Sequence, residues 1–124
     1  MYEEFDTTDV WSGEEIHCRW KSTMVAIATR HADAVDFRFD VNGRAVWIAL
    51  PCQAWVEQKK RSGKVLTDRL AAQVAGRYLK QLIAEGFAQR EICTMSIEEV
   101  LEHLDAVLDE VRERGEIPSL PVGV

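Results

Sequence analysis

The chain has 124 residues, of which 47% are hydrophobic and 29% charged, and its formal net charge is −6. The length is typical of one domain, so we expect residues 1–124 to form a single domain around one hydrophobic core. The apolar content excludes an intrinsically disordered chain, and 7 Gly and 3 Pro exclude collagen and flexible linkers.

Cysteine usage and the lack of long apolar runs indicate where the protein works. No segment approaches the roughly 20 consecutive apolar residues that cross a bilayer, and the acidic first residues do not resemble a signal peptide. Cys18, Cys52 and Cys93 are odd in number and widely spaced, which favours reduced thiols over a disulfide framework. We therefore expect a cytoplasmic protein with no membrane segment.

The clearest local pattern is a β-hairpin formed by residues 35–41 and 44–50, joined by Asn42-Gly43. Asn-Gly between two alternating runs predicts a type I′ turn, because both turn residues must adopt positive φ. This turn places residue 39 opposite 46 and residue 37 opposite 48. One face is then apolar, while Trp47 lies on the other face beside Arg38. The apolar face comprises Val35, Phe37, Phe39, Val41, Val46, Ile48 and Leu50.

Upstream of the hairpin, the alternation of Ile16, Cys18 and Trp20 with polar residues predicts a strand. The apolar run 24–29 is the expected hairpin partner of that strand. Together these segments predict a four-stranded antiparallel meander over about residues 15–50. We expect residues 1–14 to be a loose acidic segment.

Helical periodicity replaces alternation after Pro51. Residues 52–61 predict a short helix that Ser62-Gly63 ends, and apolar residues at i, i+4 spacing predict a helix of about 20 residues over 66–85. Thr67 or Asp68 can cap the start of this second helix.

The last third of the chain predicts a second long helix. Residues 91–95 form a short strand or a connector, and Ser96 and Glu99 form a capping box at the start of a helix that stops near Gly115. Residues 116–124 are an uncharged, apolar tail apart from Glu116. The whole pattern predicts an α+β fold in which an antiparallel meander of three or four strands packs against two long helices and one short helix.

No motif for catalysis or for a metal or other cofactor stands out. His17 and Cys18 are adjacent, but neighbours in a strand point to opposite faces and cannot share one zinc ion. Cys93 lies close to a predicted helix start, which can activate a thiol, yet no local signature pairs it with a histidine. We therefore predict no cofactor and favour a non-enzymatic protein. A small enzyme with a Cys/His or acid–base site is the alternative.

The charge distribution marks a candidate anion or partner surface. Residues 57–80 carry seven basic side chains against two acidic ones, whereas both flanking parts of the chain are acidic. Lys59, Lys60, Arg61 and Lys64 are the candidate surface residues. We prefer the interpretation that this segment pairs with the acidic last helix, in the same chain or in a second copy. Binding of nucleic acid or a nucleotide through 59–80 is a third, less favoured hypothesis.

Three tryptophans are candidate contact residues because they lie outside the clear core pattern. They are Trp11, Trp47 and Trp55. Together with the long amphipathic helices and the apolar tail, they lead us to expect a binding or regulatory protein that works as a homodimer or in a complex with another protein.

Overall fold

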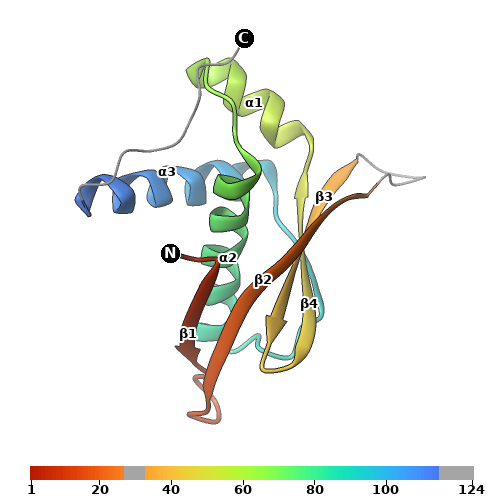
Figure 1. Cartoon of the computed structure of the whole chain (residues 1–124), viewed down its shortest axis with the longest axis vertical. Helices are drawn as coiled ribbons and strands as arrows, with labels where there is room; N and C mark the ends of the chain where they lie inside the picture. Colours follow the sequence, from red (N-terminus) through yellow and green to blue (C-terminus); the bar gives the residue numbers. More distant parts are fainter. Residues whose placement is uncertain (27–32, 115–124) are drawn as a thin grey trace.

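The structure is a computed structural model that describes residues 1–26 and 33–114. Five strands form one mixed sheet in chain order, and the helices lie on one side of it (Figure 1). This arrangement confirms the predicted α+β class. The elements are β1 (Glu4–Thr8), β2 (Glu15–Ala26), β3 (Ala34–Val41), β4 (Arg44–Pro51), α1 (Gln53–Ser62), α2 (Asp68–Ala84), β5 (Ile92–Thr94) and α3 (Ile97–Glu113).

The predicted hairpin is confirmed as β3 and β4. Phe39 pairs with Val46 and Phe37 with Ile48, and all four side chains are buried. Asn42 and Gly43 have φ values of 49° and 85°, as the type I′ turn requires. The face that carries these four residues is the inner face of the sheet, which the helices cover.

The predicted split of residues 16–29 into two strands is wrong. Glu15–Ala26 is one strand, β2, which pairs with β3 along most of its length, and residues 27–29 lie outside the described part of the chain. A register shift between Trp20 and Ser22 adds one residue, so that Trp20 and Thr23 both oppose inner-face residues of β3. Such a bulge reverses the alternation of the sequence, which is why the pattern looked like two strands.

The predicted loose segment 1–14 contains the edge strand β1, so that prediction is corrected. β1 is antiparallel to β2, and its residue Phe5 is buried opposite Cys18. Tyr2 lies just before β1, and its backbone N–H donates a hydrogen bond of 2.5 Å to the side-chain oxygen of Gln73 on α2. These contacts join residues far apart in the sequence, and a strand with one inward apolar residue has too weak a pattern to reveal them. The predicted tail 116–124 lies outside the described residues.

The helix ends follow the predicted capping chemistry. The Thr67 hydroxyl accepts a hydrogen bond from the Leu70 N–H at 3.3 Å at the start of α2. Ser96 and Glu99 form the capping box of α3, with hydrogen bonds of 2.9 and 3.1 Å. Gly63 closes α1 with a φ of 71°, a conformation that favours glycine.

The sequence predicted either a short strand or a connector over residues 91–95, and the structure shows a strand there, β5. β5 is parallel to β4, and its Cys93 pairs with Ile48 on the inner face. Its backbone contacts continue at both ends, from the Trp47 N–H to the Glu91 carbonyl and from the Met95 N–H to the Ala49 carbonyl. β5 therefore forms one edge of the sheet, and β1 forms the other.

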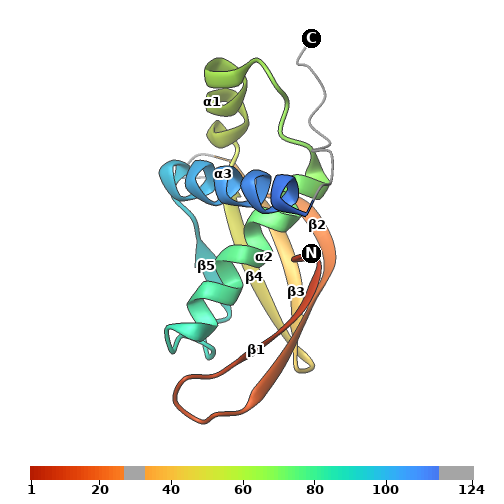
Figure 2. The same cartoon turned by 90° about the vertical axis from the view of Figure 1, so that its left-hand side faces the viewer.

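α2 is the middle layer of the molecule. It lies between the inner face of the sheet and α3, which crosses it (Figures 1 and 2). Every residue from Leu70 to Gly76 is buried, and most of these are small. A helix can be covered on two sides in this way because Ala and Gly let neighbouring backbones come close. At Gly76 the neighbour is the backbone of Tyr2, and an added Cβ would lie 2.8 Å from the Tyr2 Cβ.

We expect Gly76→Ala to destabilise the protein, although the same change stabilises most helices by about 1 kcal/mol. The new methyl group would collide with Tyr2 and displace the N-terminal segment from α2, at a cost of about 1–3 kcal/mol. Urea unfolding measures the difference. Gln81→Ala, at an exposed position of the same helix, is the matched control and should change stability by less than about 0.5 kcal/mol. A more stable Gly76→Ala protein would contradict this packing.

Candidate functional site

The predicted basic surface lies at the end of α1 and in the turn that follows. Lys59, Lys60 and Lys64 are exposed there, and Lys60 lies 3.7 Å from Glu57. Arg61 forms two hydrogen bonds, of 2.8 and 3.0 Å, to the carboxylate of Asp105 on α3. The preferred interpretation was that the basic segment pairs with the last helix, in the same chain or in a second copy, and Arg61 forms such a pair within the same chain.

The other arginines of the basic segment also bind carboxylates of the chain. Arg77 lies 3.0 Å from Glu110 of α3, and Arg69 lies 3.5 Å from Glu3. The three arginines of the basic segment therefore bind three different carboxylates, and they do not form one continuous basic patch. Pairs at this level of exposure contribute little stability, so their main effect is to orient α1, α2 and the N-terminal residues.

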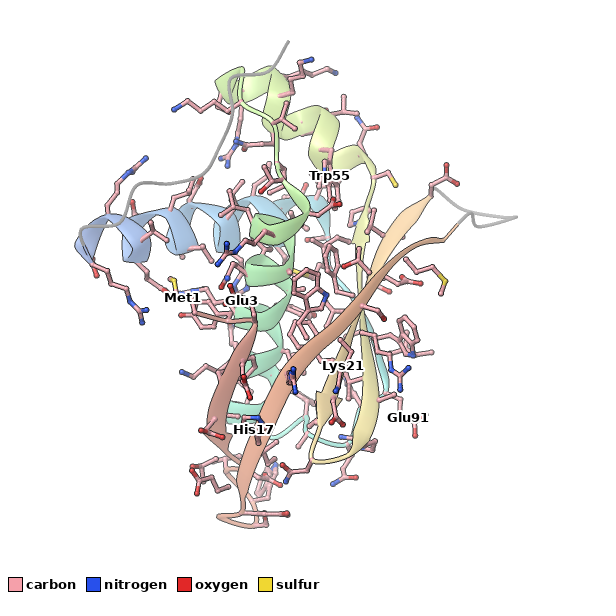
Figure 3. All side chains as sticks on the ribbon, in the orientation of Figure 1. Met1, Glu3, His17, Lys21, Trp55 and Glu91 are labelled. Atoms are coloured by element: carbon pink, nitrogen blue, oxygen red, sulfur yellow. The ribbon has the colours of Figure 1, made fainter. Side chains whose placement is uncertain are left out.

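A polar cluster fastens the N-terminal residues to α2 and α3. The Tyr2 hydroxyl donates to Glu110 at 2.5 Å, and Arg77 donates to both Glu110 and the Nδ1 of His103, the latter at 2.8 Å. Since an arginine only donates, the Nδ1 of His103 is the acceptor and carries no proton. His103 is buried, and its ring is perpendicular to the Tyr78 ring, with the two ring centres 5.6 Å apart. Figure 3 shows Met1 and Glu3 beside α2, where this cluster begins.

The pKa values in this cluster follow from burial and from Arg77. Burial lowers the pKa of His103 from its ordinary value of 6.5, and the neighbouring guanidinium lowers it further. Burial raises the pKa of Tyr2, and its hydrogen bond to Glu110 acts in the same direction. His103 therefore stays neutral, and the cluster has a structural role as a hydrogen-bonded link between the helices.

The three cysteines are free, and their surroundings oppose thiolate formation. Burial raises the pKa of Cys18 to about 12, and burial also raises the pKa values of Cys52 and Cys93. A catalytic cysteine needs the opposite shift. As predicted, His17 and Cys18 lie on opposite faces of β2, with His17 exposed and Cys18 buried. Within residues 1–26 and 33–114, no group of three or more His, Cys, Asp or Glu side chains could hold a metal ion.

The structure places the three candidate tryptophans on three different elements. Trp11 is in the turn between β1 and β2, where it is 82% exposed and borders Gly86. Trp55 is on α1 and lines a cavity. Trp47 lies on the outer face of the sheet, half-buried, with the guanidinium of Arg38 6.0 Å from its ring centre. The tryptophans therefore do not form a common site.

The described helices leave the outer face of the sheet uncovered, and apolar side chains lie on it. The register aligns Ser22, Arg38, Trp47 and Ile92 in one row across four strands. The next row aligns Met24, Asp36, Ala49 and Thr94. Met24 is 56% exposed and Ile92 is 72% exposed, so these rows present an apolar strip that contains one cation and one anion.

Partial burial within the strip raises the pKa of its one carboxylate, Asp36. The pKa of Asp36 is raised because its neighbours remove part of its water. Arg38 follows two residues later on the same strand and face. The strip was predicted in part, since the hairpin pattern placed Trp47 beside Arg38. The contributions of Met24 and Ile92 were missed, because they depend on the bulge in β2 and on the parallel pairing of β5.

Comparison with models of protein families, with curated proteins and with solved structures finds no match to this chain. In the part of the chain that the structure describes, no helix is long and apolar enough to span a membrane.

The buried His103 gives a pH-dependent contribution to stability. Its folded pKa is lowered, so this contribution is complete above pH 6.5 and is lost as the pH falls, because the unfolded chain then binds a proton that the folded chain does not. We expect His103→Gln, whose side-chain oxygen can still accept from Arg77, to lose less stability than the unmodified protein between pH 7 and pH 5. Urea unfolding at several pH values measures this slope.

The exposed His17 serves as a control, because its contribution to stability changes with pH in the opposite direction to that of His103. Its hydrogen bonds to Asp6 and Glu4 raise its pKa, so its contribution is complete below pH 6.5 and is lost as the pH rises. His17→Ala should therefore lose more stability on acidification than the unmodified protein. Identical slopes for all three proteins would refute the neutral, buried state of His103.

Proposed function

We propose that this chain is a non-enzymatic binding domain that forms a homodimer through the outer face of its sheet. The observation that supports this proposal is the apolar strip of Met24, Trp47, Ala49 and Ile92, which no described helix covers. Exposed apolar surface of this kind, with an aromatic residue near its centre, is typical of protein interfaces.

The charges of the strip favour a second copy as the partner. In a twofold interface every contact occurs twice, so a surface that carries both signs next to each other is complementary to itself. Arg38 and Asp36 meet this condition, because Arg38 of one chain can lie against Asp36 of the other in both directions. Asp36 gains from such a contact, since a guanidinium would replace the water that its apolar neighbours exclude.

The alternatives have less support. The raised pKa values of the three thiols weigh against an enzyme that uses cysteine as its nucleophile. The pairing of Arg61 with Asp105, and of Arg77 with Glu110, weighs against a nucleic-acid surface along residues 59–80, because these arginines are already held by carboxylates.

Charge exchange within the strip tests the homodimer. Arg38→Asp and Asp36→Arg should each weaken the dimer about tenfold or more, because each places like charges together in both symmetric contacts. The double variant restores opposite charges and should recover most of the affinity, except for the part lost with the contact between Arg38 and Trp47. Sedimentation equilibrium at micromolar concentration measures the dissociation constants.

Tryptophan variants locate the surface independently of charge. Trp47→Ala should weaken the dimer by about tenfold or more, as loss of a central interface aromatic does. Trp11 is more exposed than Trp47 but lies outside the strip. Trp11→Ala should therefore leave the dissociation constant of the dimer unchanged. A 14.1 kDa monomer at all concentrations would overturn the proposal, as would a dimer that resists both Trp47→Ala and the single charge variants.

A further inference from the structure

A cavity of about 420 Å³ lies on the opposite side of the sheet from the strip. It is bounded by α1, by the start of α2 and by the ends of β2 and β3 near Thr23 and Val35. Figure 3 shows Trp55 at the end of α1 that meets the sheet, where it borders this space. The volume lies within the range of roughly 300–1,000 Å³ that small-molecule sites occupy.

The described walls of the cavity are mainly apolar. Trp55 and Val35 contribute an aromatic ring and an aliphatic surface, and the Cys52 thiol is half-buried at the start of α1. Thr23 contributes a hydroxyl, which already accepts a hydrogen bond from the Trp20 indole at 3.1 Å. A ligand with an apolar body fits this lining, since few polar groups would lose their partners when water leaves.

The described residues that line the cavity carry a negative charge. Among the described lining residues, Asp68, the first residue of α2, is the one charged side chain. Asp33 borders Cys52 as well: the Cys52 N–H donates to the Asp33 carbonyl at 2.9 Å. The Asp33 carboxylate also raises the pKa of the Cys52 thiol, after the larger effect of burial. Asp68 therefore places one carboxylate in the described lining, and the face of the Trp55 indole ring also attracts cations.

We propose that this cavity binds a small organic cation, an amine with an apolar body that rests on Trp55 and Val35 while its ammonium group faces Asp68. The site is distinct from the outer strip, because the two lie on opposite faces of the sheet. A cation is favoured over a neutral or anionic ligand because the described walls offer a carboxylate and an aromatic face but no cationic group.

A matched ligand series tests the sign of the charge without any mutation. Phenethylamine, 2-phenylethanol and phenylacetate share one apolar body and carry a positive charge, no charge and a negative charge at pH 7. Isothermal titration should give the order amine, alcohol, acid, with about tenfold weaker binding of the alcohol than of the amine. Equal binding of all three, tighter binding of the acid, or no binding of the amine at millimolar concentration would overturn the proposal.

Variants and a thiol reaction place the binding in this cavity. Asp68→Asn and Trp55→Leu should each weaken phenethylamine binding about five- to tenfold, whereas Trp11→Leu, in the turn between β1 and β2, should have no effect. Bound phenethylamine should slow the alkylation of Cys52 by iodoacetamide. Peptide mass spectrometry measures the rate of this alkylation. Amine binding that leaves Cys52 alkylation unchanged, or that Trp11→Leu abolishes, would refute this location. Each variant is first compared with the unmodified protein by thermal unfolding.

Discussion

The burial of α2 on two sides is the constraint on which the rest of the structure depends. One side of this helix lies on the apolar face of β3 and β4, and the other side receives α3. Small residues from Ala71 to Gly76 allow both contacts, and the same small surface admits the backbone of Tyr2. All described helices are thereby gathered on one side of the sheet, and they leave its other side uncovered.

Sequence patterns predicted the parts of the fold in which local and global signals agree. Asn42-Gly43 and the alternation on either side specify the same register, and the Ser96–Glu99 capping box coincides with the start of an amphipathic helix. The errors occur where long-range pairing overrides a local pattern. The bulge after Trp20 inverted the alternation of β2, and β1 depends on a partner strand more than on its own composition.

The candidate sites were predicted to a smaller extent. The position of Trp47 beside Arg38 follows from hairpin register alone, and the pairing of the basic segment with the last helix follows from the charge distribution. The cavity beside Trp55 was not predictable, since α1, α2 and two strands must first come together to enclose it. Sequence spacing indicates which residues share a face of one element, but a concave surface arises only from the packing of several elements.

The parallel pairing of β5 with β4 imposes an order on folding. β1 to β4 join neighbouring segments of the chain, whereas α1 and α2 separate β4 from β5. Closing that long loop costs conformational entropy before the few residue pairs of β5 return any stabilisation. We therefore expect the meander and the central helix to form before β5 pairs with β4, and we expect the amide hydrogens of β5 to exchange by local opening of this edge without global unfolding.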